Sequence, residues 1–277
     1  MILMVGMEAR DDATDVAHTV GISQDKDGWF IESHPKLDPV ATTTDGVYID
    51  GRLSVKGDMT GPASAHIVLR DPTVDMAVME TARGGLLREG LGYRRCDVSA
   101  CLNVASDHLG LKGIDTLEQL AEVKRIPIEV ARDTAVLNAD DELCLRMADY
   151  TEAEHVCYVT MNPAHALVKE HIRAGGRAVV LEQGINGDMI TLYDNGTHFQ
   201  LLWTYLIPAT MEGKATHNVQ NAMFAAALAF SLGKRRLAGE IERHWPHFGL
   251  LGLFRLLRQF ERGIIDAPQG LVVILRE

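Results

Sequence analysis

Apolar runs alternate with amphipathic stretches along most of the chain, from about residue 75 onward. The apolar runs predict buried strands over residues 75–80, 96–104, 134–138, 155–160 and 177–182. The stretches with helical periodicity or helix-terminating glycines predict helices over residues 116–130, 140–150, 162–174 and 218–232. Asp194-Asn195-Gly196 predicts a hairpin between residues 189–193 and 198–203. Strands that alternate with helices indicate an α/β fold with a mostly parallel, doubly wound sheet.

The two ends of the chain do not follow this alternation. Residues 1–40 mix a short apolar start with acidic and polar clusters, and residues 234–277 are rich in Leu, Phe and Arg. We therefore expect an irregular N-terminal segment over residues 1–40, a central domain over residues 41–233 and an atypical tail over residues 234–277. Within the tail, residues 245–262 predict a helix that packs loosely or not at all on the domain.

Composition narrows the class of protein. The chain has 277 residues, 47% of them hydrophobic, which is enough for a substantial core. Its net charge of −11 argues against a nucleic-acid partner, and no apolar stretch is long enough to span a bilayer. The four cysteines lack metal-type spacing, so we expect buried free thiols in a reducing, cytoplasmic compartment.

Polar side chains follow two of the predicted strands. Glu80 and Asn103 lie at the carboxyl ends of the first and second strands, and His108 follows the second. Ligands of such sheets bind at the carboxyl ends of the strands, where a carboxylate and an imidazole could share a Mg²⁺ ion with a substrate phosphate. The alternative is structural, with Glu80 paired to Arg83 and His108 capping a loop. The residue types alone favour neither.

Lys124 falls on the apolar stripe of the helix predicted over residues 116–130. A lysine on a buried face is costly unless it is paired or modified. The side chain could extend to the edge of the domain, or it could be neutral enough to react with carbon dioxide. The resulting carbamate would be an anion able to hold a second Mg²⁺ ion.

Asn218 and Asn221 share one face at the start of the helix predicted over residues 218–232. Their amides could read the edge of a purine, or they could only cap the helix. The Asn138-Ala139-Asp140-Asp141 stretch after the third predicted strand is a further weak indication of a site.

Four stretches together resemble one family. In order along the chain they are ETARGGLLREGL, CDVSACLNVASDHLGLKGIDTLEQLAEVK, AVLNADDE and HNVQNAMFAAALA. This order resembles the central domain of the Mur ligase family, and within it the Mur-ligase-like half of cyanophycin synthetases, over residues 40–233. The resemblance implies an ATP-dependent ligase that phosphorylates a carboxylate, which an amine then attacks to form an amide.

The resemblance also implies roles for individual residues, position by position in the matching motifs. By resemblance, Glu80 and His108 bind Mg²⁺, Lys124 and Arg83 are catalytic, and Lys124 is carbamylated as in many relatives. The residues that approach nucleotide, substrate or phosphates would be Thr42, Thr43, Asp45, Asn218 and Asn221. The implied cofactors are ATP and Mg²⁺. The implied partners are a small-molecule or aspartate/arginine polymer substrate, and a second copy of the chain or a full-length synthetase.

The chain departs from the family at its ATP-binding loop. No GxxxxGK[ST] motif occurs in it. Glu8, Asp11 and Asp12 stand at the positional counterpart, where acidic side chains would repel a triphosphate. Residues 234–277 also fail to match the third domain of the family. The α/β domain is therefore expected to be incomplete, and the sequence supports two functions: a ligase, or a catalytically inactive remnant or scaffold.

Overall fold

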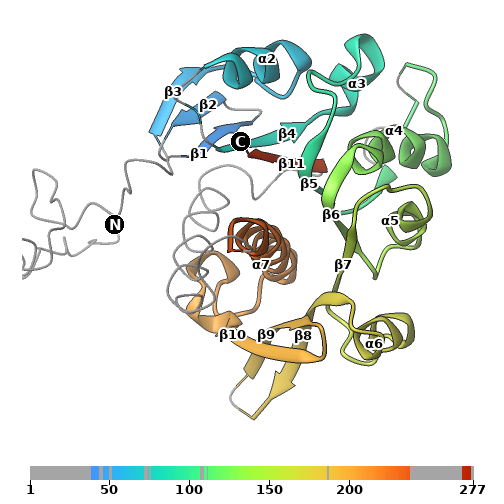
Figure 1. Ribbon diagram of the computed structural model, residues 1–277, viewed down its shortest axis with the longest axis vertical. Helices are drawn as coiled ribbons and strands as arrows, with labels where there is room; N and C mark the ends of the chain where they lie inside the picture. Colours follow the sequence, from blue (N-terminus) through green and yellow to red (C-terminus); the bar gives the residue numbers. More distant parts are fainter. Residues whose placement is uncertain are drawn as a thin grey trace, which may run out of the picture. The chain divides into compact units, whose positions relative to one another are not determined.

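In the part of the chain that the structure describes, eleven strands form one sheet in the order β10-β9-β8-β7-β6-β5-β11-β4-β1-β2-β3 (Figure 1). The computed structural model describes residues 39–43, 46–49, 52–71, 74, 76–106, 109–110, 112–185, 187–237 and 270–275. The strands are β1 (Pro39–Thr42), β2 (Gly46–Ile49), β3 (Arg52–Lys56), β4 (Met76–Thr81), β5 (Cys96–Cys101), β6 (Ala131–Asn138), β7 (His155–Thr160), β8 (Arg177–Gly184), β9 (Gly187–Asp194), β10 (Thr197–Trp203) and β11 (Gly270–Leu275).

Helices cover both faces of the sheet (Figure 1). They are α2 (Pro62–Arg70), α3 (Arg83–Glu89), α4 (Leu117–Glu129), α5 (Glu142–Leu145), α6 (Ala166–Arg173) and α7 (Thr216–Leu237). Three short 3-10 turns, η2 (Arg146–Asp149), η3 (Thr204–Leu206) and η4 (Pro208–Thr210), complete the described elements. Helix α7 packs on one face, and α2 to α6 lie on the other. The predicted α/β fold is confirmed.

The direction of the strands is mostly parallel. Strands β5 to β8 pair in parallel, and β1 pairs in parallel with β4. Strand β11 is antiparallel to both β4 and β5, so those two strands share one direction. In the described sheet, β11 is the strand that lies between β4 and β5 (Figure 1). Strand β11 begins at the carboxyl ends of β4 and β5.

Side chains alternate between two cores, as the period of two in a strand requires. Val78, Val98 and Val136 face α7, whose Phe224 and Leu228 are fully buried. On the other face, α4 packs its apolar stripe against β5 and β6. The strand positions in these two cores are among the apolar runs that predicted the strands.

Local sequence features set the ends of several elements. Thr116 and Gln119 form a reciprocal capping box that starts α4, and Pro127 lies in its last turn. At the β9–β10 hairpin, Asn195 and Gly196 both adopt positive φ, which the two-residue turn needs. The predicted hairpin is confirmed, with Gly196 supplying a φ of 75° at no steric cost.

Several elements differ from expectation. The helix predicted over residues 140–150 is helical in α5 and then tightens into the 3-10 turn η2. Strands β1 to β3 and helix α2 were not predicted, because their short, glycine-punctuated segments lack a sustained period. Leu53 and Val55 on the edge strand β3 are also about half exposed. Strand β11 pairs part of the predicted tail with the central sheet, and residues 245–262 lie outside the described residues.

Strand β11 makes a test of this topology possible. Val273 lies opposite Val78 of β4 and Val98 of β5. We expect Val273→Pro to lower the free energy of unfolding by about 3 kcal/mol or more, because proline removes a ladder hydrogen bond from a central strand. Urea unfolding followed by circular dichroism measures this. Val273→Ala keeps the N–H and is the control, and equal losses in the two variants would contradict a central position for β11.

Candidate functional site

Glu80 is the carboxylate at the carboxyl end of β4. It is 2% exposed and lies between two neighbouring strands, since Met79 pairs with Thr42 of β1 and Glu80 itself pairs with Leu271 of β11. An acid in this position costs free energy unless polar groups or a cation compensate it. Its burial at a strand end is the first requirement of the predicted metal site.

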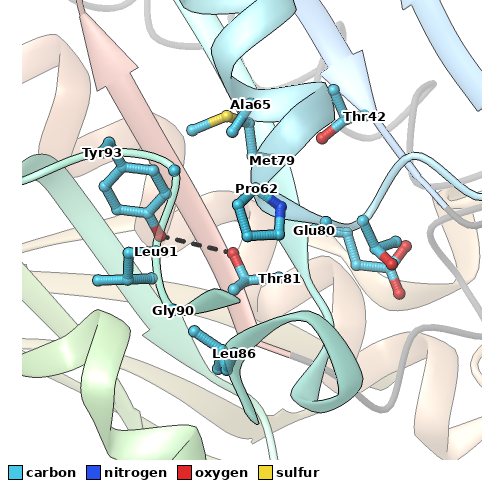
Figure 2. A pocket seen from close by; sticks show the side chains of 13 residues that line it. Thr42, Pro62, Ala65, Met79, Glu80, Thr81, Leu86, Gly90, Leu91 and Tyr93 are labelled. Carbon is cyan, nitrogen blue, oxygen red and sulfur yellow. Dashed lines mark hydrogen bonds between the residues drawn. The ribbon is translucent and has the colours of Figure 1, made fainter. Parts of the chain in front are cut away.

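A small cavity beside Glu80 is lined by both apolar and hydroxyl-bearing side chains. Met79, Leu86 and Leu91 line it together with Thr42, Thr81 and Tyr93 (Figure 2), and Thr60 is a further lining residue. The Tyr93 and Thr81 hydroxyls share a hydrogen bond of 3.5 Å. Burial, with a smaller contribution from Cys96, raises the pKa of Tyr93 well above its usual range, so the phenol stays protonated.

The turn before α2 shapes one wall of this cavity. Asp58 accepts hydrogen bonds from the backbone N–H and the hydroxyl of Thr60, and the Thr60 carbonyl accepts from Ala82 N–H at 3.3 Å. The loop after Glu80 is thereby tied to this turn. A Cβ at Gly92 would lie 2.6 Å from the Pro62 carbonyl oxygen, so only glycine fits this close approach.

Three side chains hold the backbone that follows β5. Asn138 Nδ2 donates to the Leu102 carbonyl at 2.7 Å, and Asp141 Oδ2 accepts from Val104 N–H at 2.8 Å. Between them, Lys124 Nζ donates to the Asn103 carbonyl at 2.9 Å. Residues 102–104, which we call the β5 exit, are therefore fixed by α4, β6 and the residue that caps α5.

Lys124 is 5% exposed and keeps its ammonium at the carboxyl edge of the sheet. This contact with the β5 exit agrees with a lysine on the apolar stripe that extends to the edge of the domain. The Asn103 Oδ1 atom, on the same exit, is buried and has no hydrogen-bond partner among the described residues. A polar ligand at this edge would satisfy that oxygen.

Glu80 and Lys124 approach the edge from different faces. Alternation places Glu80 on the same face of β4 as Val78, which packs in the α7 core, whereas α4 carries Lys124 on the opposite face. They can therefore meet only over the carboxyl edge. Their convergence with His108 stays a prediction, because residues 107–108 lie outside the described residues.

The predicted phosphate-contacting residues have mixed placements. Thr42 is buried and lines the cavity. The Thr43 hydroxyl bonds with both backbone groups of Gly46 at 3.2 Å, so it closes the turn between β1 and β2. Asp45 lies outside the described residues, and half-buried Arg83 is the first residue of α3.

The predicted adenine-binding asparagines lie in the first turns of α7. Asn218 Nδ2 donates to the Ala209 carbonyl at 2.6 Å, and its Oδ1 is buried without a hydrogen-bond partner in the described part of the chain. Asn221 lies one turn further along the same helix and is half-buried. A purine contact by Asn218 would use the remaining amide hydrogen or this oxygen.

The donor chemistry around Glu80 fits Mg²⁺. The buried Glu80 carboxylate is a hard oxygen ligand, which Mg²⁺ prefers, and the ion commonly keeps several waters. The described residues contain no group of three or more His, Cys, Asp and Glu side chains that could hold a metal. An ion held here would need water or substrate oxygens for most of its remaining ligands.

Sequence patterns missed part of this site. Thr60 and Tyr93 join Glu80 only through tertiary packing, and no spacing in the sequence connects them. The Asn138–Asp141 stretch gave a weak indication, and its side chains support the β5 exit. All four cysteines are free and buried, as predicted. None of the described helices is long and apolar enough to cross a membrane.

The fold and the polar residues at the carboxyl edge of the sheet define a class of protein. Mostly parallel α/β domains of this class bind their ligands at that edge. The model of the Mur ligase middle domain matches residues 40–229, and the chain belongs to this family. Cyanophycin synthetase of Synechocystis sp. is 47% identical over 194 residues, which cover 69% of this chain and 22% of that protein. The protein of the same name from Trichormus variabilis is 48% identical over 191 residues, covering 68% and 21%.

The chain thus spans about a fifth of the length of these synthetases. A shorter similarity links it to an iron-sulfur component of the CoB--CoM heterodisulfide reductase of Methanopyrus kandleri. That similarity is 45% identity over 51 residues, or 18% of this chain and 8% of that protein. It is too short to show membership of a second family.

The β5 exit gives a stability test. Asp141→Ala removes the cap of α5 and leaves Val104 N–H buried without its acceptor, so we expect a loss of about 2–3 kcal/mol. Asp141→Asn keeps one side-chain oxygen and should lose less. The exposed Asp149→Ala is the control, with an expected change within about 0.5 kcal/mol. Urea unfolding would contradict this role for Asp141 if Asp141→Ala matched Asp149→Ala.

Proposed function

We propose that this chain is the central part of an ATP-dependent ligase of the cyanophycin synthetase type, which joins a carboxylate to an amine through an acyl phosphate. Membership of the Mur ligase middle-domain family supports the reaction class. The identity with cyanophycin synthetases supports a substrate that is an aspartate- and arginine-containing polymer. The observation that carries the proposal is the carboxyl edge, where buried Glu80 lies one strand away from the rigid β5 exit.

The proposed roles follow from placement and charge. Glu80, with His108, would hold Mg²⁺ against the phosphates of the nucleotide, and the ion would neutralise negative charge as it develops. Lys124 would act as a carbamate that holds a second ion, and Arg83 would act at the reacting phosphate. Thr42, Thr43 and Asp45 would approach the phosphates, and Asn218 and Asn221 the adenine.

A carbamate at Lys124 would keep one N–H on Nζ, which could still donate to the Asn103 carbonyl. Its carboxylate group is anionic and is repelled by that carbonyl oxygen. The carboxylate would therefore point past the β5 exit toward the edge of the sheet. This orientation would turn the Lys124 carbamate toward the ion at Glu80.

A second candidate function is a non-catalytic scaffold that associates with a full-length synthetase. The absence of a GxxxxGK[ST] motif from the 277 residues favours it. A P-loop supplies backbone N–H donors and a lysine to the phosphates, and each charge-assisted hydrogen bond contributes about 1.5–3 kcal/mol. Losing three such bonds weakens nucleotide binding by about 5 kcal/mol or more, which is several thousand-fold.

Calorimetric titration with Mg-ATP distinguishes these functions for the isolated chain. We expect a dissociation constant no tighter than about 1 mM, because the phosphate-binding donors are missing. The chain alone should then form no amide bonds from aspartate, arginine and ATP. A micromolar dissociation constant would contradict the scaffold function and would show that another loop of this chain binds the phosphates.

Paramagnetic resonance with Mn²⁺ tests the metal site without requiring activity. We expect the chain to bind Mn²⁺ weakly, and Glu80→Gln to weaken that binding about tenfold or more, because the substitution removes the only charge that Glu80 contributes. Glu118→Gln changes an exposed residue of α4 and is the matched control. If both variants bind Mn²⁺ as the unmodified chain does, Glu80 is not a metal ligand.

A further inference from the structure

Cys101 and Cys144 place two thiols side by side at the carboxyl edge of the sheet. Their Sγ atoms are 3.4 Å apart, although the residues are 43 positions apart in the sequence. Cys101 is the last residue of β5, and Cys144 lies in α5. Both side chains are at most 1% exposed.

We propose that Cys101 and Cys144 are a disulfide-forming pair that, when oxidised, bonds α5 covalently to the β5 exit. A disulfide bond is about 2.0 Å long, so the sulfur atoms must approach each other by about 1.4 Å. Helix α5 has only four residues and continues into the 3-10 turn η2. A movement of this size is small for so short an element.

The other two cysteines make a useful contrast. Cys96 donates to the Pro127 carbonyl at 3.7 Å, and Cys157 lies on β7 with no thiol as a hydrogen-bond partner among the described residues. Both are as deeply buried as the pair. Proximity of two thiols, and not burial or composition, therefore distinguishes Cys101 and Cys144.

The oxidation is a two-electron thiol–disulfide exchange with a low-molecular-weight disulfide such as glutathione disulfide. One cysteine thiolate attacks the glutathione disulfide and displaces one glutathione thiolate. The second cysteine then attacks the mixed disulfide and displaces the other. The two protein thiols lose two protons and two electrons in total, and the oxidant becomes two glutathione thiols.

The folded structure makes this exchange slow. The Cys101 contact and burial raise the pKa of Cys144 well above its usual range, and a protonated thiol is a poor nucleophile. The oxidant must therefore reach the pair when α5 opens locally. Asp140 and Glu142, on either side of the α5 cap, are exposed, so this opening does not require the sheet to separate.

The pair is connected to the backbone that Lys124 contacts. Cys144 donates to Cys101, Cys101 donates weakly to the Asn103 carbonyl at 3.9 Å, and Lys124 donates to the same carbonyl. Oxidation removes both S–H donors and fixes α5 against the β5 exit. The hydrogen bond from Val104 N–H to Asp141 should therefore break less often. This consequence does not depend on whether the chain is a ligase.

The test equilibrates the full chain with glutathione disulfide in a urea concentration below the unfolding transition, which increases local opening. Thiols are then counted after full denaturation, and disulfide-linked peptides are identified by mass spectrometry. We expect the count to fall from four to two, with a Cys101–Cys144 linked peptide that dithiothreitol releases. A full count of four at equilibrium, or a linked peptide containing Cys96 or Cys157, would overturn the proposal.

Two variants test which cysteines form the disulfide. Cys157→Ser should still lose two thiols, whereas Cys144→Ser should form no internal disulfide. Hydrogen exchange at Val104 should slow on oxidation in the unmodified chain and stay unchanged in Cys144→Ser. If the disulfide forms and the Val104 exchange rate does not change, the pair does not restrain the β5 exit and that part of the proposal is wrong.

Discussion

This domain depends on one constraint: the backbone N–H and C=O groups on the facing edges of β4 and β5 need hydrogen-bond partners. Buried N–H and C=O groups must be paired, and in the described sheet the C-terminal strand β11 pairs with both edges. Adjacent strands lie about 4.8 Å apart, so β11 sets the separation of β4 and β5 at about 9.5 Å. The carboxyl ends that carry Glu80 and Asn103 are held at that separation.

The polar site is rigid on one side of β11 because side chains from distant segments restrain backbone atoms. Asn138, Lys124 and Asp141 each bond to one residue of the β5 exit. On the other side, the Thr60 turn holds the loop after Glu80. Rigid support of this kind is what a site needs to bind phosphates and metal ions in one geometry. In the proposed ligase, this rigidity would serve amide-bond formation at the edge of the sheet.

The sequence predicted the elements that depend on local periodicity. Strand β4, helix α4 and the β9–β10 hairpin follow from an apolar run, an apolar stripe with helical spacing and an Asn-Gly turn, all of which operate within a few residues. Strand β11 could not be predicted in its place, because a six-residue apolar segment can pair with any open edge and long-range contacts decide which. The motif-based site residues Glu80 and Lys124 were found at the carboxyl edge. Their separation onto opposite faces depends on strand alternation and helix packing, which the motifs do not encode.

Native-state hydrogen exchange followed by mass spectrometry tests the central claim, that β11 joins β4 and β5 into one sheet. If β11 is a central strand, the amides of β4, β5 and β11 exchange together, and the opening free energy of each equals the free energy of global unfolding. Edge strands β3 and β10 should exchange earlier and serve as internal references. Exchange of the β11 peptide within seconds, while β4 and β5 remain protected, would contradict the account, because it would show that those two strands do not depend on β11.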